Sequence, residues 1–263
     1  MKHVLVTGAY GGMGRAVVKA LRAQGVCVYA LDRRVEEAEE GVVPIELDIT
    51  SEESVRAALN TVRAHTNSLF AIMHFAGVYM LDSLVEMPSD AFRRIFDVNF
   101  YGVFLINKTF LPLLSRGSRI LITTSELAPL DPLPFTGVYA VSKGALDKYA
   151  YSLRMELQLL GISVSVLRAG AVNTGMLGVS TDALDRFCSS TEHYACNADR
   201  FKRIVGRVEA RHISPERLAG RAVRIVGKRR PAFAYSINRN PLLLLLNLLP
   251  KRLQLSIIRR VLK

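Results

Sequence analysis

Residues 3–14 read HVLVTGAYGGMG, and this stretch decides the fold of the chain. An apolar strand pattern runs to Thr7, and four glycines within the next seven residues lead into a helical pattern. Glycines let the backbone turn tightly and let a pyrophosphate approach the helix N-terminus, where free N–H groups and the helix dipole favour an anion. The order of strand, turn and helix therefore predicts dinucleotide binding. The residues of this predicted glycine loop are Thr7, Gly8, Tyr10, Gly11, Gly12, Met13 and Gly14.

Short apolar runs alternate with helical patterns over most of the chain. Strands are predicted at residues 3–7, 26–31, 42–47, 69–75, 119–124, 163–167 and, in a shorter form, 232–236. Helices are predicted at residues 15–24, 90–114 and 139–160, with two more that start near Ser51 and at Ser214-Pro215. Strands without polar alternation are buried on both faces, and alternation with helices indicates right-handed parallel crossovers. The sequence thus predicts an α/β fold, a Rossmann-like doubly wound parallel sheet forming a single domain over residues 1–236, with ligand sites at the carboxyl ends of the strands.

The composition fits one large hydrophobic core. Half of the 263 residues are hydrophobic, and the length alone does not require a second domain. The three cysteines, Cys27, Cys188 and Cys196, form neither an even framework nor a metal-binding spacing, so we expect a reducing compartment and no metal. No signal-peptide pattern precedes the apolar run at Val4, so a cytoplasmic protein is expected.

Asp32 ends the second predicted strand, eighteen residues after Gly14. A carboxylate at this point can accept hydrogen bonds from the ribose hydroxyls of adenosine, and it would repel a 2′-phosphate. This favours NAD over NADP as the cofactor. Arg33 and Arg34 follow at once and can offset the repulsion, so NADP is kept as the alternative.

Tyr139 and Lys143 stand one helical turn apart in a predicted helix, so their side chains share a face. A phenol titrates near pH ~10, and a fixed ammonium nearby favours the phenolate and lowers that pKa. The pair is a candidate acid/base for interconverting an alcohol and a carbonyl. Ser125 ends a predicted strand fourteen residues before Tyr139, and its hydroxyl is a candidate partner for a substrate oxygen. Thr123 and Thr124 directly precede Ser125, so the hydroxyl in this position could be shifted by one residue.

In combination these residues resemble the short-chain dehydrogenase/reductase family over residues 1 to 235. The matching pieces, in order, are Thr7-Gly8-x-x-x-Gly12-x-Gly14, Asp32, Asp48, Asn99, Ser125 and Tyr139-x-x-x-Lys143. The resemblance implies that Tyr139 is the catalytic acid/base and that Ser125 orients the substrate oxygen. It implies that Lys143 lowers the pKa of Tyr139 and holds the nicotinamide ribose, and that Asn99 positions the helix and a water leading to Lys143.

The same resemblance implies the remaining cofactor contacts. The adenine ring would be contacted by Asp48 and the residue after it, and the nicotinamide by a loop after the sixth strand whose threonine bonds the amide or a phosphate. The residues concerned are Asp48, Ile49, Ala76 and Gly77 on the adenosine side, and Gly170, Val172 and Thr174 on the nicotinamide side.

Three features depart from the usual pattern of the family. The glycines also satisfy Gly8-x-x-Gly11-x-x-Gly14, the spacing of an extended branch with sugar-nucleotide epimerases, although the length and the context of Asn99 argue against that branch. His74-Phe75 stand where the family usually has two asparagines, and we interpret His74 as a strand-end residue, neither a base nor a ligand. Ala169 replaces a proline, which is expected to loosen the nicotinamide loop.

Residues 174–213 interrupt the alternation of strands and helices. A connection of this length inside a compact domain is usually functional, and it follows the sixth strand, so we predict a lid over the strand ends. An apolar substrate pocket is suggested by Met176, Leu177 and Leu184 of this stretch, together with Leu127 and Phe135.

The positive charge of the chain is concentrated in its last quarter. Residues 200–263 hold 17 Lys and Arg against two acidic residues, whereas residues 1–199 hold 18 against 21. Leucines accompany these charges more than aromatic residues do, which favours lipid over nucleic acid as an anionic partner. Residues 237–263 form a predicted extension whose apolar run is too short to span a bilayer and whose last segment is a basic amphipathic helix. This extension is expected to lie on a membrane surface, on the lid or on a second subunit.

The expected function is an NAD(P)-dependent oxidoreductase that interconverts an alcohol with a ketone or aldehyde. Retinol- and hydroxysteroid-type members of the family often carry apolar or basic C-terminal extensions, so the resemblance implies a lipophilic steroid-, retinoid- or acyl-like substrate. It also implies a homodimer or homotetramer in the cytoplasm, on the inner face of a membrane if the extension binds lipid. The alternatives are a dinucleotide-binding scaffold or sensor without catalysis, and a membrane-associated protein that acts through its basic tail.

Overall fold

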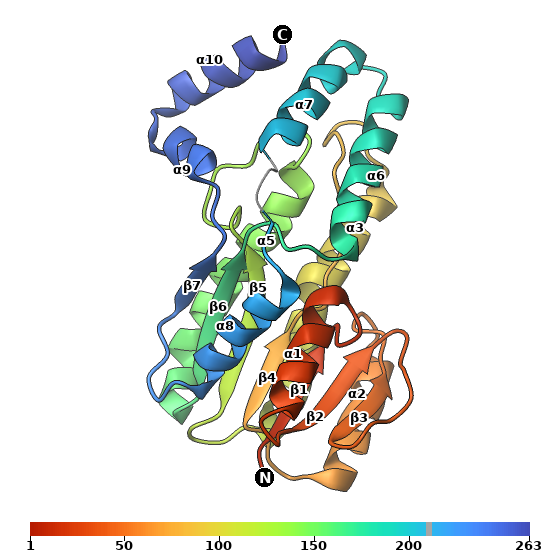
Figure 1. Ribbon diagram of the computed structural model, residues 1–263, viewed down its shortest axis with the longest axis vertical. Coiled ribbons are helices and arrows are strands. Elements are labelled where there is room, and N and C mark those ends of the chain that lie inside the picture. Colours follow the sequence, from red (N-terminus) through yellow and green to blue (C-terminus); the bar gives the residue numbers. More distant parts are fainter. Residues whose placement is uncertain (209–211) are drawn as a thin grey trace.

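Seven parallel strands form a single sheet in the order β3-β2-β1-β4-β5-β6-β7 (Figure 1). The computed structural model describes residues 1–208 and 212–263, without the side chains of residues 176, 177 and 206–208. The strands are β1 (His3–Thr7), β2 (Cys27–Asp32), β3 (Val42–Glu46), β4 (Ala71–His74), β5 (Arg119–Ser125), β6 (Ser163–Ala169) and β7 (Ala234–Ile237). The helices are α1 (Gly12–Arg22), α2 (Glu52–His65), α3 (Ser89–Phe96), α4 (Gly102–Phe110), α5 (Gly137–Leu157), α6 (Gly175–Ser190), α7 (Ala195–Val208), α8 (Pro215–Gly227), α9 (Pro241–Leu248) and α10 (Lys251–Leu262). The predicted doubly wound parallel sheet is confirmed.

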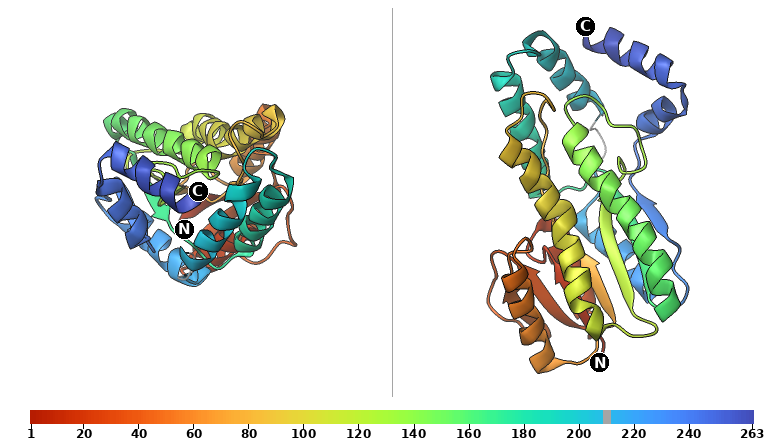
Figure 2. Two further views of the ribbon diagram at one scale, coloured as in Figure 1. Left: turned by 90° about the horizontal axis from the view of Figure 1, so that it is seen from above. Right: turned by 180° about the vertical axis from the view of Figure 1, so that it is seen from behind.

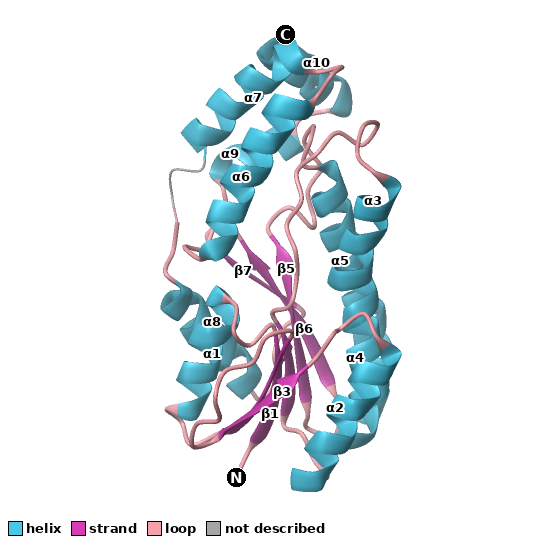
Figure 3. Ribbon diagram, turned by 90° about the vertical axis from the view of Figure 1, so that its right-hand side faces the viewer, coloured by secondary structure: helices cyan, strands magenta, loops and turns pink. Residues whose placement is uncertain are grey.

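Helices cover both faces of the sheet, so the domain has three layers (Figure 3). Successive residues of a strand point to opposite faces, and β1 shows the consequence. Leu5 packs into the core under α2, α4 and α5, whereas Val4 and Val6 pack into the core under α1 and α8. Because both faces are buried, β1 and β4 lack polar alternation.

The order of the strands reverses between β1 and β4. β2 and β3 lie on one side of β1, and β4 and the later strands lie on the other. In sheets of this kind ligands bind at the carboxyl ends of the strands next to such a reversal. The glycine loop follows β1 at this point, and Tyr139 lies in the first turn of α5, which follows β5.

The helix predicted at residues 90–114 is interrupted by a change in its hydrogen-bonding pattern. A π-helical turn, Asp97–Tyr101, separates α3 from α4, and a 3₁₀ turn, Leu111–Leu113, ends the run. A π-helical turn accommodates one extra residue, and such turns are frequent at functional sites. The buried Asn99 lies within this turn.

Residues 174–213 are largely helical, which the sequence did not indicate. After β6 the chain forms α6 and α7, and residues 209–211 of the predicted lid, like the side chains of Met176 and Leu177, lie outside the described residues. Figures 1 and 2 show α6 and α7 beyond the carboxyl ends of the strands. Here they form a third apolar core, called the upper cluster, whose buried residues are Leu81, Phe135, Ala183, Leu184, Phe187, Ala198 and Phe201.

Candidate active site

The glycine loop is held in a shape that only glycine permits at several positions. Gly8 has a φ of 67°, and a Cβ built on it would lie 2.5 Å from the backbone nitrogen of Ala76. A Cβ on Gly14 would lie 2.0 Å from the carbonyl oxygen of Gly8. Gly11 begins α1 without a side-chain cap, and no acidic residue lies in the first turn of the helix. The first N–H groups of α1 are therefore open to an anionic ligand, as a dinucleotide pyrophosphate requires.

The loop after β6 lies against the glycine loop. A Cβ on Gly12 would stand 2.6 Å from the Cβ of Thr174, so the absence of a side chain at Gly12 lets the two loops meet. Val172 is buried and forms a parallel bridge with Ile213, and this bridge anchors the loop after β6. The residues predicted to contact the pyrophosphate and the nicotinamide are thus brought together from β1 and β6.

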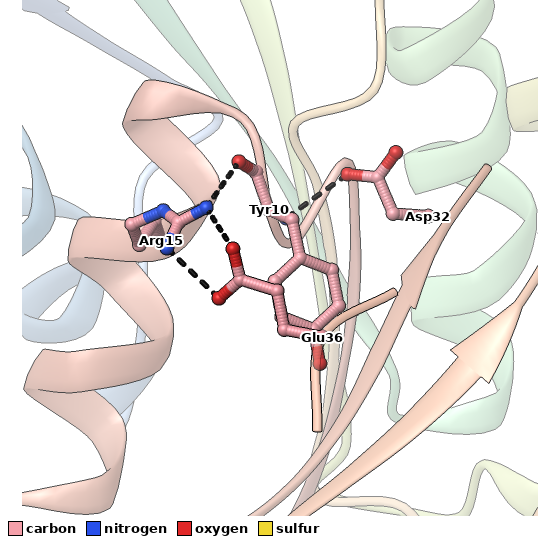
Figure 4. Close-up of polar contacts among 4 residues, drawn as sticks. All are labelled: Tyr10, Arg15, Asp32 and Glu36. Atoms are coloured by element: carbon pink, nitrogen blue, oxygen red, sulfur yellow. Dashed lines mark hydrogen bonds and ion pairs between the residues drawn. The ribbon is translucent and has the colours of Figure 1, made fainter. Parts of the chain in front are cut away.

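Asp32 points at the glycine loop. One carboxylate oxygen accepts a hydrogen bond from the Tyr10 backbone N–H at 2.9 Å, and the other accepts one from the Arg33 N–H at 2.8 Å (Figure 4). Arg15 binds Glu36 through two hydrogen bonds, of 2.9 Å and 2.5 Å, and also donates to the Tyr10 carbonyl at 3.3 Å (Figure 4). A carboxylate therefore faces the predicted adenosine side, and the nearby guanidinium of Arg15 is already neutralised.

Of the two residues predicted to contact the adenine ring, Asp48 presents its side chain and Ile49 only its backbone. Asp48 accepts hydrogen bonds from the Thr50 N–H at 2.9 Å and the Thr50 hydroxyl at 2.7 Å, which lower the pKa of its carboxyl. The side chain of Ile49 is buried in the core, and a Cβ on Gly102 would lie 2.8 Å from its Cγ1. The Ile49 side chain thus faces α4, so only the backbone of this residue is placed to meet a cofactor.

Two of the predicted cofactor residues brace the loop between β4 and α3. Thr7 is fully buried, and its hydroxyl accepts a hydrogen bond from the Ala76 N–H at 3.5 Å. Gly77 leaves room for its neighbours, because a Cβ there would lie 3.1 Å from Asn99 Oδ1 and 3.3 Å from Lys143 Nζ. The backbone after β4 can therefore approach both the glycine loop and the lysine.

Tyr139 meets Ser125 where α5 begins above the end of β5. The Ser125 hydroxyl lies close enough to Tyr139 to favour its ionised form, and it accepts a hydrogen bond from the Leu127 N–H at 3.2 Å. Burial nevertheless raises the pKa of Tyr139 to about 12, and the influence of Ser125 opposes this only in part. At neutral pH the chain's own residues therefore keep this phenol protonated.

The prediction that Lys143 lowers the pKa of Tyr139 is wrong for the protein's own residues. The ammonium lies 5.9 Å from the centroid of the Tyr139 ring, and its nearest bond is to the Thr123 carbonyl at 3.5 Å. Burial also lowers the pKa of Lys143 to about 8, so this lysine stays mostly protonated at pH 7 but loses its proton more readily than an exposed lysine. Desolvation is thus the largest cause of the pKa shift in each of the two groups.

Asn99 connects the π-helical turn with α5 and the loop after β4. Its side chain accepts a hydrogen bond from the Val78 N–H at 2.8 Å and donates to the Val78 carbonyl at 3.0 Å. It also donates to the Ser142 hydroxyl at 3.2 Å. Both N–H groups of the amide are used, so Asn99 positions Val78 and Ser142, the chain neighbours of Gly77 and Lys143.

Three residues near the site were not predicted. Tyr79 packs its ring on Tyr139, with centroids 4.9 Å apart. Ser142 links Asn99 to the Tyr139 carbonyl, to which its hydroxyl donates at 2.8 Å. Glu126 follows Ser125, and its carboxylate accepts a hydrogen bond from the Asn240 N–H at 2.5 Å. An aromatic residue in a loop and a serine within a helix carry no distinctive sequence signal, whereas an acid directly after a strand-end serine could have been noticed.

His74 is the last residue of β4 and is buried, as its interpretation as a strand-end residue requires. Its Nε2 lies 3.0 Å from Asn107 Oδ1, and burial lowers its pKa to about 4. Asn107 in turn donates to the Tyr149 hydroxyl at 3.3 Å. The imidazole is therefore neutral at physiological pH and belongs to the packing between β4, α4 and α5.

A profile of the short chain dehydrogenase family matches residues 2–185, more than half of the chain. The chain belongs to the short chain dehydrogenase family. An NADPH-dependent 1-acyldihydroxyacetone phosphate reductase of Schizosaccharomyces pombe is 34% identical over 69% of the chain and 65% of its own length. Estradiol 17-beta-dehydrogenase 2 of Mus musculus is 32% identical over 70% of the chain and 51% of its own length. The chain thus spans between half and two thirds of these two relatives.

Further relatives of this short chain dehydrogenase match over more of their length. A 3-ketodihydrosphingosine reductase of Bacteroides thetaiotaomicron is 26% identical over 88% of the chain and 85% of its own length. A short chain dehydrogenase from Burkholderia cenocepacia, solved in complex with NADP, covers all of both chains with a TM-score of 0.75 and 21% identity. Aldohexose dehydrogenase of Thermoplasma acidophilum has a TM-score of 0.75 and 22% identity over 91% of this chain and 93% of its own. These solved structures support the fold.

Proposed function

We propose that the protein is an NAD(P)-dependent oxidoreductase that interconverts a lipophilic alcohol with its ketone or aldehyde. The observation that carries this proposal is the proximity of Ser125, Tyr139 and Lys143 at the carboxyl end of β5, where Ser125 and Lys143 are buried and the Lys143 ammonium lies 5.9 Å from the centroid of the Tyr139 ring. This constellation lies at the strand edge where the glycine loop and Thr174 meet. A proton donor, its hydroxyl partner and a dinucleotide cradle thus share one site.

The protein's residues supply orientation and the proton. A nicotinamide cofactor, when bound, gives or takes the hydride. In the reducing direction the neutral Tyr139 phenol donates its proton to the carbonyl oxygen, which Ser125 holds by a hydrogen bond. Lys143, buried beside the Tyr139 ring, would hold the ribose of the nicotinamide. In the oxidising direction the phenolate of Tyr139 accepts the proton of the alcohol.

We propose NAD as the preferred cofactor, with NADP as the weaker one. Asp32 presents a carboxylate beside the glycine loop, where it would bind ribose hydroxyls and repel a 2′-phosphate. Arg15 does not compensate, since Glu36 neutralises it. Arg33 and Arg34 are exposed next to Asp32 and supply the residual affinity for NADP. NADP occurs in the names of two similar proteins, which supports keeping it as the second cofactor.

The proposed substrate class is a hydroxyl or carbonyl compound with a large apolar part. The names of three relatives mention an acyl ketone phosphate, a steroid and a ketosphingoid. The upper cluster, which we propose to be the lid side of the substrate site, places aromatic and aliphatic side chains next to Tyr79. Leu184 and Phe135 of the predicted pocket belong to this cluster, whereas Leu127 is half-buried in the turn after β5.

Two assembly features complete the proposal. The face of α5 that points away from the sheet exposes Val141, Tyr151 and Met155, and we propose that it pairs with a second copy of the chain. The Met155→Glu variant should then lower the molar mass measured by light scattering. We further propose that the enzyme works at a membrane surface through its C-terminal extension.

The test of the proposed chemistry is the Tyr139→Phe variant, with NAD and NADP and a panel of long-chain ketones, steroids and their alcohols. Turnover should fall by about 10²–10⁴-fold, the usual contribution of a positioned acid/base, while NADH binding followed by fluorescence should persist. Tyr151→Phe is the matched control, because this tyrosine lies exposed on the same helix. Unchanged turnover of a confirmed substrate by Tyr139→Phe would contradict the mechanism, and cofactor binding without any turnover across the panel would favour a scaffold.

A further inference from the structure

The C-terminal strap, residues 238–263, begins beside the candidate active site. Asn238 crosses Gly170 so closely that a Cβ on that glycine would lie 1.8 Å from the Asn238 carbonyl oxygen. Asn238 also donates from its side chain to the Ala171 carbonyl at 2.8 Å. Two residues later, the Asn240 N–H donates to Glu126, the neighbour of Ser125. The strap is thus fixed to both loops that flank the site.

The strap then runs over the loop between β5 and α5 and ends on α7. Asn247 at the end of α9 accepts a hydrogen bond from the Asp131 N–H at 2.7 Å, and Lys251 at the start of α10 forms an ion pair with the Asp131 carboxylate. At the other end of α10, Leu262 packs against the upper cluster, and its carbonyl accepts a hydrogen bond from Asn197 at 2.7 Å. The inner side of the strap is therefore occupied by the protein itself.

The strap exposes many large apolar side chains. Along α9, Leu242, Leu245 and Leu248 are exposed to 60%, 60% and 81%. They recur every three residues and therefore lie along one side of the helix. On α10 the exposed apolar residues are Leu253, Leu255, Ile257 and Val261. So many large apolar side chains on two adjoining helices indicate a contact surface for another body.

The charges around these leucines are all positive. The strap contains six Lys and Arg and no acidic residue. Lys251 is paired with Asp131, but Arg252, Arg259, Arg260 and Lys263 form no ion pair within residues 1–208 and 212–263. No helix in this part of the chain has the length and apolarity needed to cross a bilayer. Leucines flanked by unpaired cations suit the interface of an anionic bilayer, where apolar chains meet phosphate groups.

We propose that the outer face of α9 and α10 docks on an anionic lipid bilayer and that the strap, anchored at Gly170, Glu126 and α7, forms the rim through which a bilayer-dissolved substrate reaches Tyr139. The docking specifies the membrane association proposed above, and the route of the substrate rests on the proposed chemistry. Figures 1 and 2 show α9 and α10 at the pole of the molecule that also holds α6 and α7, opposite the N-terminus. The helices α9 and α10 therefore lie at the same end of the molecule as the carboxyl ends of the strands.

Two double variants of the full chain test the docking, with vesicles of phosphatidylcholine alone or mixed with phosphatidylglycerol. The unaltered protein should sediment with the mixed vesicles and less with the neutral ones. Arg259→Glu with Arg260→Glu should weaken this binding by about 25-fold or more, since each cation near an anionic surface contributes about fivefold. Leu245→Glu with Leu248→Glu should weaken it by at least about tenfold, through lost burial of apolar surface.

Matched controls lie at the opposite end of the sheet. Leu159 and Leu160 are exposed to 80% and 54% just before the start of β6, and Arg229 and Arg230 are exposed just before β7. Leu159→Glu with Leu160→Glu and Arg229→Glu with Arg230→Glu make the same changes of charge and apolarity. They should bind vesicles within about twofold of the unaltered protein, because the potential of an anionic surface does not extend to the opposite end of the sheet. Equal losses in the controls, or no binding of the unaltered protein to mixed vesicles, would overturn the docking surface.

A second copy of the chain is the competing occupant of the leucine face. If the Leu245→Glu/Leu248→Glu variant turns a dimer into a monomer in sedimentation velocity without changing vesicle binding, the lipid proposal is wrong. The route of the substrate has its own readout: the strap variants should lose turnover of a long-chain ketone supplied in mixed vesicles and keep turnover of a short, water-soluble ketone. If the strap variants turned over the bilayer-dissolved ketone as fast as the unaltered protein, the proposed route of the substrate past the strap would be wrong. Failure of the proposed chemistry is distinguishable, because it would appear as persistent turnover in Tyr139→Phe.

Discussion

The ring of Tyr79 packs on the ring of Tyr139 with 4.9 Å between centroids and 56° between planes. Tyr79 comes from the loop after β4, which Asn99 also holds through Val78. The loop thereby limits the positions available to the Tyr139 side chain beside Ser125.

Replacing Tyr79 by Ala should lower kcat/KM by about two- to tenfold, because an aromatic pair of this kind contributes about 0.5–1.5 kcal/mol. Tyr79→Phe keeps the ring and should retain most of the activity. Steady-state kinetics of both variants, together with cofactor affinity, check the expectation. A Tyr79→Ala enzyme with unaltered kcat/KM would show that Tyr139 is positioned without this contact.

Asp32→Ser should shift the cofactor preference toward NADP. Removing the carboxylate abolishes its repulsion of a 2′-phosphate and leaves Arg33 and Arg34 beside the site. We expect the ratio of kcat/KM for NADP to that for NAD to rise by at least about tenfold, a change of roughly 1.4 kcal/mol. Glu46→Ser, at an exposed position at the end of β3, is the control and should leave the ratio unchanged.

Lys143→Met should abolish most turnover and yet stabilise the fold at pH 7. Burial lowers the pKa of this lysine from 10.5 to about 8, so the folded state binds fewer protons than the unfolded state between these values. Its charge therefore destabilises the fold most below pH 8, and this penalty is relieved as the pH rises toward 10.5. The linkage relation limits the gain to about 3 kcal/mol. Urea unfolding at pH 7 and pH 10 should show a gain that shrinks with pH; a gain that is equal at both would contradict the buried charge.

Glu86→Ala should loosen the turn between α6 and α7. Its carboxylate accepts hydrogen bonds from the Thr191 hydroxyl at 2.7 Å and from the Glu192 and His193 N–H groups at 2.9 Å each. The bond from His193 is the largest cause of its lowered pKa, so this tether is fully present above the ordinary value of 4.5 and is lost as the pH falls below it. Hydrogen exchange should rise in the turn, and KM should rise more than kcat falls. Glu53→Ala, on the exposed side of α2, serves as the control.

The layers of the fold could be predicted because their cause is local. Buried parallel strands have continuous apolar runs, and the helices between them carry the 3.6-residue period, so even the boundaries of β1 follow from the sequence. The helix over residues 90–114 was predicted as a unit, but its π-helical turn was not, since that turn depends on what Asn99 binds on other elements. The helices α6 and α7 were missed because their apolar residues face a small cluster and not the main core.

The candidate site could be predicted where spacing within one element decides it. Tyr139 and Lys143 are four residues apart on α5, and the glycines are constrained by a single turn. The electrostatics could not be predicted in the same way. Desolvation depends on atoms from β5, the loop after β4 and α5 together, and it reverses the expected direction of the pKa of Tyr139. Contacts such as Glu126 with Asn240 join residues more than a hundred positions apart and leave no periodic trace.

The extra residue of the Asp97–Tyr101 turn gives this helix an unusual response to insertion and deletion. Removing one residue from an α-helix rotates everything beyond it by about 100° and normally disrupts the packing of a whole face. Here the same deletion would restore regular α-helical geometry, and α4 could keep its register on the sheet. The damage would be confined to α3 and to the amide that supports Val78. A length change at this point would thus separate folding from the arrangement of the site, and natural variants shortened there would be expected to fold with a displaced loop after β4.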